Sequence, residues 1–311
     1  MTMPARAHHA MQPALADEPA RAALWRAAAE AVAPAQVATA TVLIDTHGHY
    51  YPCFDAARFL DAAARNFERH ARRAGAAGGP PGHLVIAATR DFDGLGALRR
   101  EADHGNAGQW RLEPLREPEC LLGIHAGSPR LLLIAGHQAA TAEGLEVLAI
   151  GTAAAVPDGL SLHTTVRLAR QVAPIVVIPY GLGKWWRKRG GLLREYLPLA
   201  GAGLCLGDSA CRPAAAPAPA LLRRARALRV PVLAGTDPLP IRRDAAIAGS
   251  YGLTLRCPYD PSRPLASLTP ALLTAGGNAT TFGRRRGPLA ALASQALLRL
   301  SPRAGAGEGG A

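Results

Sequence analysis

The ten residues from Val42 to Tyr51, VLIDTHGHYY, constrain the fold of this chain more than any other segment. Three apolar residues run into Asp45, and two histidines follow it, one residue apart. Because a strand directs alternate side chains to one face, an extended backbone would present His47 and His49 side by side. Two neutral imidazoles on one face can bind a single divalent ion. The alternative is a strand end with two surface histidines; we favour the metal site because sites of α/β proteins lie where strands end.

The composition allows a full hydrophobic core but indicates no particular partner. The chain has 311 residues, 49% of them hydrophobic, which suffices for one large α/β domain or two modest ones. The formal charge of +12 comes almost entirely from arginine, since lysine occurs only at positions 184 and 188. The arginines are scattered along the sequence, so the charge alone does not predict a nucleic-acid surface.

Cysteine usage and hydropathy favour the cytoplasm. The five cysteines are odd in number and include no C-x-x-C pair, so neither a disulfide framework nor a structural zinc site is expected. No apolar run reaches the ~18–20 residues that a membrane-spanning helix needs. The N-terminus lacks the apolar segment of a signal peptide. We therefore expect a cytoplasmic protein without membrane contact, in an oligomeric state that the sequence leaves open.

Strand and helix patterns alternate along the chain. Apart from the opening strand, buried strands are expected at 84–88, 145–151, 175–178, 204–208 and 230–238. Asp55 and Ser161 are expected to cap helices. Two apolar runs around 120–125 and 131–135 predict a β-hairpin, and a late helix is expected to open at Thr269-Pro270. This alternation indicates an α/β fold built on a parallel barrel or sheet.

We expect three parts in the chain. A flexible N-terminal segment and a helix occupy residues 1–40, with the helix near 14–33. One barrel domain follows over residues 41–285. A C-terminal helix (288–300) and a flexible tail lie within residues 286–311.

Acids and histidines follow the ends of several expected strands: His47, His49, Asp91, Glu146, Asp208 and Asp237. In a parallel barrel these ends face the same way, so the side chains can meet. Two histidines with a carboxylate suit Zn²⁺, Mn²⁺ or Fe²⁺. Such an ion would lower the pKa of a bound water, and Asp237 would ligate the ion or take the proton. The alternative for Asp91 and Asp208 is a helix cap, and for Glu146 a solvated strand position.

The segment from Gly181 to Gly190 contains both lysines and follows a strand. Its glycines allow close backbone approach, and Lys184 and Arg187 could bind a phosphate. It lacks the spacing of a P-loop. The alternative is a basic surface loop whose tryptophans pack on the core; we favour anion binding, and we expect Tyr251 to line the same pocket.

Taken in order, these motifs resemble those of the PHP family, the polymerase and histidinol phosphatase domains. Asp45-Thr46-His47-Gly48-His49 is similar to the opening D-x-H-x-H of that family. Thr89–Gly94, the stretch 133–151 and Ala234–Asp237 resemble its T-D-H-x-x-x-G, G-x-E and G-S-D-x-H blocks. The resemblance covers about residues 42–240. It implies a distorted TIM-like (β/α)7 barrel that carries a metal, here with a β-hairpin inserted near 119–136.

Several positions depart from the family pattern. Gln138 stands where the family has a bridging glutamate, and Leu239 where it has the last histidine. Arg90-Asp91 replaces an Asp-His pair, and Ile178-Pro179-Tyr180 replaces a strand end with histidine. The remaining ligands can hold one ion but not a multi-metal cluster, with Glu146 or Asp91 recruited. Gly276–Gly283 also resembles the ending of amidohydrolases, in which Asp237 would be the last-strand acid.

The sequence therefore predicts a metal-dependent hydrolase, specifically a phosphoesterase of the PHP type with a reduced metal site. The expected metal ligands are His47, His49 and Asp237. The expected catalytic residues are Asp237 and Glu146. A small anionic substrate would meet Lys184, Arg187 and Tyr251. The alternative is a catalytically degenerate barrel that binds a ligand or partner through the same cleft.

Overall fold

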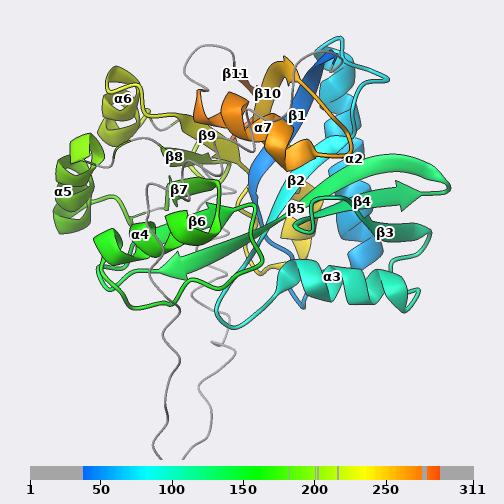
Figure 1. Ribbon diagram of the computed structural model, residues 1–311, viewed down its shortest axis with the longest axis horizontal. Coiled ribbons are helices and arrows are strands. Elements are labelled where there is room, and N and C mark those ends of the chain that lie inside the picture. The colour runs from blue at the N-terminus through cyan, green and yellow to red at the C-terminus, as the bar shows by residue number, and fades with distance from the viewer. Residues whose placement is uncertain are drawn as a thin grey trace, which may run out of the picture.

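The computed structural model describes residues 38–287, except residues 182, 200, 202, 216 and 275–278. The helices expected at 14–33 and 288–300, and the glycines expected to end the late helix, lie outside the described residues. In the described part, eleven strands form one sheet with helices around it (Figure 1).

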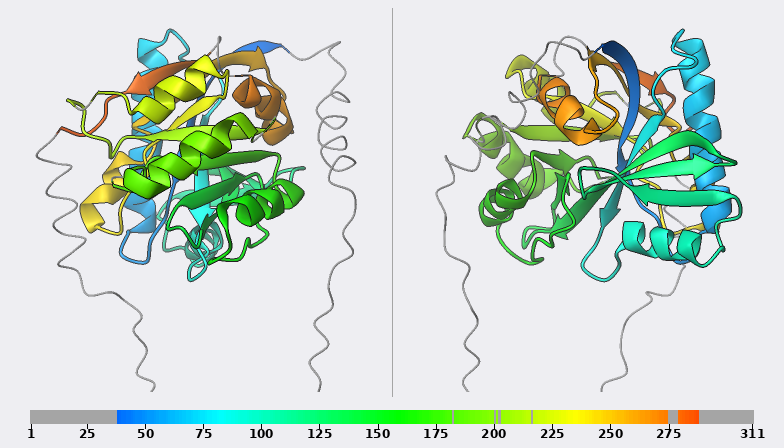
Figure 2. Two further views of the ribbon diagram at one scale, coloured as in Figure 1. Left: turned by 90° about the vertical axis from the view of Figure 1, so that its left-hand side faces the viewer. Right: turned by 45° about the vertical axis from the view of Figure 1, so that its right-hand side comes forward.

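Seven strands of this sheet curve into a nearly closed barrel (Figures 1 and 2). In order around the barrel they are β1 (Thr39–Gly48), β2 (Gly82–Ala88), β5 (Ser128–Ala140), β6 (Glu146–Ile150), β7 (Ile175–Pro179), β8 (Leu204–Ser209) and β9 (Val232–Gly235). The last strand returns beside the C-terminal half of the first, where Thr46 Oγ1 donates a hydrogen bond to the Ala234 carbonyl (3.0 Å). The distorted TIM-like barrel that we expected is confirmed.

The expected parallel arrangement is wrong at β6. This strand pairs antiparallel with both β5 and β7, whereas β1, β2 and β5 are parallel to one another, as are β7, β8 and β9. Only residues 141–145 connect β5 to β6, which is too short for a crossover between parallel strands. Glu146 consequently starts its strand opposite Ala140, at the end of the barrel where the parallel strands finish.

The remaining strands extend the sheet on two sides. They are β3 (Trp110–Pro114), β4 (Cys120–His125), β10 (Tyr251–Pro258) and β11 (Ala279–Gly283). β4 and β5 form the expected hairpin. β10 pairs with the N-terminal half of β1, and β11 then ends the sheet. We did not anticipate β3, β10 or β11, although the buried residues of β10 alternate as a half-buried strand requires.

The helices are α2 (Ala56–Arg73), α3 (Gly94–Asp103), α4 (Leu162–Val172), α5 (Arg187–Tyr196), α6 (Ala220–Ala227) and α7 (Pro264–Leu273), with 3₁₀ turns η1 (Leu197–Leu199) and η2 (Arg242–Ile247). Asp55 and Ser161 cap α2 and α4 through their side chains, as expected. The predicted start of the late helix at Thr269-Pro270 is wrong, because Pro264 already occupies the first position of α7, where a missing N–H costs nothing.

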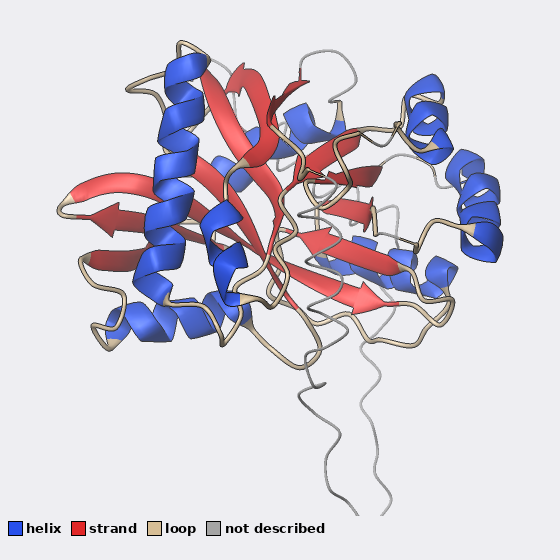
Figure 3. Ribbon diagram, turned by 180° about the vertical axis from the view of Figure 1, so that it is seen from behind, coloured by secondary structure: helices blue, strands red, loops and turns tan. Residues whose placement is uncertain are grey.

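Alternate residues of the barrel strands form an inner and an outer core. In β2, Val85 and Ala87 belong to the inner cluster, whereas Leu84 and Ile86 pack outward with α2, which runs along the outer face of the sheet (Figure 3). Side chains of α7 join the inner cluster, and Glu117 caps this helix by accepting hydrogen bonds from its backbone. Among the described residues, no helix combines the length and hydropathy needed to cross a bilayer.

Candidate metal centre

The end of β1 places its two histidines together inside the barrel. His47 and His49 are 5% and 2% exposed, and their Nε2 atoms lie 3.1 Å apart. The pairing of β1 with β2 is irregular between Asp45 and Gly48, so the backbone carrying the histidines departs from regular extended geometry. Both side chains nevertheless face one point, as the H-x-H spacing predicts.

Asp237 reaches the same point from the loop after β9. Its backbone N–H donates a hydrogen bond to the His47 carbonyl (2.7 Å), and its φ of +50° is in the left-handed region that non-glycine residues rarely adopt. Its Oδ1 lies 3.8 Å from His47 Nε2, while its Oδ2 accepts a hydrogen bond from Ser209 Oγ (3.3 Å). One ligand atom each of His47, His49 and Asp237 lies within 4.8 Å of the others. We call these three residues the His/Asp cluster.

Gln138 brings a fourth ligand atom, an amide oxygen, to the cluster. Its Oε1 lies 2.8 Å from His47 Nε2. The sequence marked this position as a departure from the PHP pattern, and we did not count it as a ligand. The alignment of Gln138 with the family's bridging glutamate could have identified it as a ligand, because an amide oxygen can occupy the position of a carboxylate oxygen.

The tautomer of His49 leaves a lone pair facing the cluster. Its Nδ1 contacts the Ala87 carbonyl (2.9 Å), which can only accept, so Nδ1 carries the proton and Nε2 does not. Burial, followed by the neighbouring His47, lowers the pKa of His49 to about 4, which keeps the ring neutral near pH 7. Of the four atoms that converge, only His47 Nε2 can then bring a proton. Such an acceptor-rich group is suited to a cation.

The separations between these atoms bracket those expected around one divalent ion. Two ligand atoms at about 2.1 Å from a metal lie roughly 3.0–3.4 Å apart in octahedral or tetrahedral geometry. The structure has 3.1 Å between the two histidine nitrogens, 2.8 Å from Gln138 to His47 and 3.8 Å from Asp237 to His47. Imidazole and carboxylate ligands together suit Zn²⁺, Mn²⁺ or Fe²⁺, so the cluster could bind such a metal.

Asp45 holds the ends of β1 and β9 together behind the cluster. This fully buried carboxylate accepts hydrogen bonds from Thr236 N (2.9 Å), Thr236 Oγ1 (2.5 Å), Gly249 N (3.0 Å) and His47 N (3.2 Å). Burial raises its pKa to about 6, against the opposing effect of these four bonds. The residue therefore fixes the backbone of His47 and is placed behind the ligands rather than among them.

Glu146 and Lys184 form an ion pair. Glu146 is paired with Ala140, so the two side chains point to the same face of the sheet. Gln138 lies two residues before Ala140 in β5 and points to that face as well. The ring of Tyr51 stacks on His49, with ring centroids 5.5 Å apart. Burial, together with the charges of Asp237 and Glu146, raises the pKa of the Tyr51 hydroxyl. Tyr51 thus lies near both the His/Asp cluster and Glu146.

Three other expected residues lie apart from the cluster. Arg187 is exposed at the first position of α5. Tyr251 donates a hydrogen bond to Asp208 (3.0 Å), and this carboxylate is bound in turn by Arg212 through two hydrogen bonds of 2.7 Å. The recruitment of Asp91 is a wrong expectation, because its exposed side chain pairs with the adjacent Arg90.

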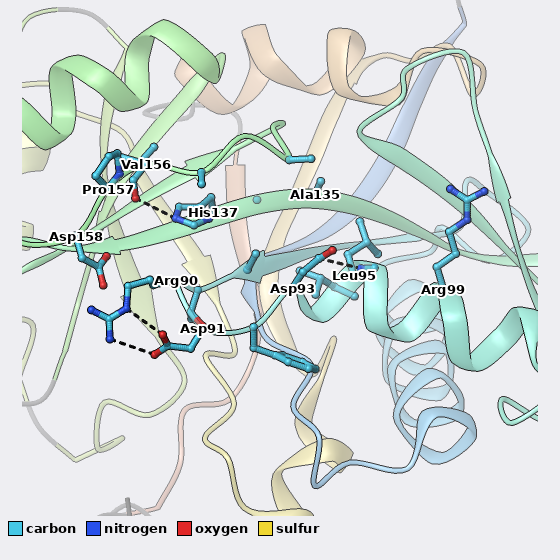
Figure 4. A pocket seen from close by; sticks show the side chains of 18 of the residues that line it. Arg90, Asp91, Asp93, Leu95, Arg99, Ala135, His137, Val156, Pro157 and Asp158 are labelled. Carbon is cyan, nitrogen blue, oxygen red and sulfur yellow. Dashed lines mark hydrogen bonds and ion pairs between the residues drawn. The ribbon is translucent and has the colours of Figure 1, made fainter. Parts of the chain in front are cut away.

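A cavity of about 680 Å³ contains Asp91 and lies outside the barrel (Figure 4). His137 lines it and contacts the Val156 carbonyl (3.1 Å). His137 and Gln138 are consecutive in β5, so their side chains point to opposite faces of the sheet. No residue of the His/Asp cluster lines this cavity, which is therefore separate from the candidate metal centre.

No protein-family model matches the chain, and neither does any curated protein. The fold is similar to that of PsfC from Pseudomonas syringae PB-5123, with a TM-score of 0.50 and 13% sequence identity over 84% of this chain and 99% of PsfC. A second similar structure is the lesion-specific endonuclease PfuEndoQ from Pyrococcus furiosus, with a TM-score of 0.45 and 11% identity over 78% of this chain and 57% of that protein. At such identities the likeness to PsfC concerns the fold alone.

Proposed function

We propose that the protein is a metal-dependent hydrolase, a PHP-like phosphoesterase with a single-metal site. The observation that carries the proposal is the convergence of His47, His49 and Asp237, whose ligand atoms lie within 4.8 Å of one another. The order of the PHP-like motifs and the barrel fold support it independently, because the three ligands come from the strand ends at which such barrels place their sites.

Each residue has a role in this proposal. His47, His49 and Asp237 hold the ion, and the amide oxygen of Gln138 completes its protein ligands. When bound, the ion would lower the pKa of a coordinated water and so make a hydroxide nucleophile accessible near neutral pH. Asp237 or Glu146 would serve as the proton acceptor beside the ion.

The ammonium of Lys184 meets the negative charge of the substrate in this proposal. Its present partner is the Glu146 carboxylate, and a phosphate group could replace that partner because both offer oxygen acceptors. Arg187 would approach the substrate from the first residue of α5. The chemical class that these cations favour is a small phosphate ester.

One observation favours a second candidate function, a barrel that binds a ligand without hydrolysing it. Gln138 offers a neutral oxygen where a carboxylate would bind a cation more strongly, and Asp91 points away from the site. A weakened metal site would retain the cleft and its cations but lose the chemistry.

Metal content and phosphatase activity separate these functions. We expect purified protein to bind about one Zn²⁺, Mn²⁺ or Fe²⁺ per chain by mass spectrometry of metals, and His47→Ala to lose it. The exposed His104 provides the matched control, His104→Ala, which should retain the metal. We also expect metal-dependent hydrolysis of p-nitrophenyl phosphate or its bis-ester. Stoichiometric metal without hydrolysis of either ester would favour the ligand-binding barrel, and protein that binds no divalent ion would exclude the hydrolase.

A further inference from the structure

The strand β11 ends the sheet on one side (Figure 1). Arginines that are far apart in the sequence gather around it. Two cavities, of about 530 and 520 Å³, lie against this strand and share Thr281, Gly283 and Arg284. Six of the described arginines line them. Arg212 is hydrogen-bonded to Asp208, and the other five are Arg69, Arg73, Arg226, Arg284 and Arg285. We call these five residues the arginine surface. They come from the last turns of α2, from α6 and from the segment after β11.

No acidic side chain of the described residues forms a salt bridge with this surface. Arg69 donates to the neutral amide of Asn66, and Arg285 donates to the Ala214 carbonyl (3.4 Å). The other terminal nitrogen of Arg285, Nη1, is buried and has no hydrogen-bond partner in the described part of the chain. The surface therefore has unused donors as well as unpaired charge.

Carboxylates are nearly excluded from both cavities. The residues described as lining the first cavity include no acid, and those lining the second include one, Asp208. Asp208 is already bound by Arg212 and Tyr251. Clustered arginines of this kind raise the local concentration of anions and bind phosphate oxygens through paired N–H groups.

The position of the two cavities indicates an extended anion. Thr280 lines only the first cavity, whereas Tyr251 lines only the second; Thr281 and Gly283 of the edge strand line both, as does Arg284, the residue after the strand. A ligand that reaches both must carry negative charge at several points along its length. Regularly spaced phosphates, as in a nucleic-acid backbone, meet this requirement.

The burial of the aromatic residues that line the cavities favours duplex over single-stranded nucleic acid as the ligand. Phe282, His70 and Tyr251 line the cavities but are only 9%, 9% and 5% exposed. Unpaired bases would find no exposed ring on which to stack, whereas proteins that bind single strands usually provide one. A duplex stacks its bases internally and presents its backbone.

We propose that the arginine surface binds the phosphate backbone of double-stranded nucleic acid without recognising its sequence. The surface contains no residue of the His/Asp cluster, so this binding goes beyond the proposed hydrolase and does not require a metal. The proposal differs from the expectation, based on arginines scattered in the sequence, that no nucleic-acid partner is indicated.

Fluorescence anisotropy with a labelled DNA duplex of about 20 base pairs tests the proposal, using the full chain in the presence of EDTA. Five phosphate contacts predict that log Kd rises with log salt concentration with a slope of about 4–5. The triple variant Arg226→Gln, Arg284→Gln, Arg285→Gln should weaken binding at least tenfold at 0.1 M salt and reduce the slope by about 2–3.

A charge-matched control replaces three arginines outside the two cavities, Arg65→Gln, Arg99→Gln and Arg111→Gln, and should alter binding much less. Equal weakening by both triple variants would overturn the proposed location. Absence of duplex binding at 0.05 M salt, or tighter binding of a single strand of equal length, would overturn the proposed ligand. His47→Ala should bind duplex as the unmodified protein does, so failure of the metal-site proposal and failure of this one are distinguishable.

Discussion

Gln138 Oε1 lies 2.8 Å from His47 Nε2, although 91 positions separate the two residues in the sequence. This contact places a neutral amide among two imidazoles and one carboxylate, at the position where the resemblance to the PHP family leads one to expect a glutamate. The protein ligands of the proposed ion therefore carry one negative charge, contributed by Asp237.

Replacing Gln138 by glutamate should strengthen metal binding. The added carboxylate would face the ion with a full negative charge, and a charged ligand in place of a neutral one is expected to increase affinity about tenfold or more. Competition with a chromogenic chelator measures this affinity. Gln109→Glu, at an exposed position, adds the same charge elsewhere, and equal affinities of the two variants would show that Gln138 does not contact the ion.

Removing the ammonium of Lys184 should weaken anion binding. Lys184→Ala is expected to raise the Kd for inorganic phosphate about tenfold, because the cation beside Glu146 is lost. The only other lysine is the exposed Lys188, so Lys188→Ala is the matched control. Isothermal titration calorimetry of both variants gives the comparison. An unchanged Kd for Lys184→Ala would show that the segment from Gly181 to Gly190 is a basic surface loop that does not bind the anion.

Asp45→Asn should destabilise the barrel and disturb the cluster. The carboxylate accepts backbone hydrogen bonds at both oxygens, from Thr236 N and His47 N at one and from Gly249 N at the other. An asparagine must turn its NH₂ group toward one of these N–H donors, at a cost of roughly 2–3 kcal/mol. Urea unfolding measures the change, with the exposed Asp103→Asn as control. Equal stability of the two variants would contradict the structural role of Asp45.

Gly235→Ala should destabilise the protein, whereas the same change at Gly191 should not. An added Cβ would lie 2.8 Å from His47 Cα, where β9 and β1 meet, and such overpacking costs about 1–3 kcal/mol. In contrast, a Cβ at Gly191 in α5 meets nothing within 4 Å. Gly191→Ala should therefore stabilise the protein by about 0.5–1 kcal/mol. Thermal unfolding of the two variants should show shifts of opposite sign.

His83 should make the protein less stable in acid. Burial lowers the pKa of this fully buried ring from 6.5 to about 4, and its Nε2 lies 2.8 Å from the Tyr259 hydroxyl. Between these pH values the unfolded chain binds the proton and the folded protein does not, so the free energy of unfolding falls as the pH falls from 6.5 toward 4. The contribution of this residue is up to about 3 kcal/mol.

Urea unfolding at pH 7 and pH 4.5 isolates the contribution of His83 when the unmodified protein is compared with His83→Gln. The variant retains a polar side chain beside Tyr259 but has no group that titrates in this range. We expect its loss of stability on acidification to be smaller by up to about 3 kcal/mol. Identical losses would show that the imidazole is not the acid-sensitive group.

Local patterns in the sequence were sufficient for much of the fold. The caps at Asp55 and Ser161, the apolar runs of the barrel strands and the hairpin between β4 and β5 depend on residues close in the chain, whose hydrogen bonding and burial follow from spacing. The pairing of His47 with His49 was also predictable from local sequence, because the period of a strand places both rings on one face.

Tertiary structure decided which of the candidate groups that are far apart in the sequence meet. Asp237 and Gln138 reach the histidines because β9 and β5 lie on the barrel wall near the end of β1, whereas Asp91, at a similar strand end, turns to Arg90 and remains exposed. The sequence by itself determined the two histidines, the charge and the α/β alternation. Closure of the barrel brought the metal ligands together, and the packing of α2 and α6 near the edge strand β11 gathered arginines that are scattered in the sequence.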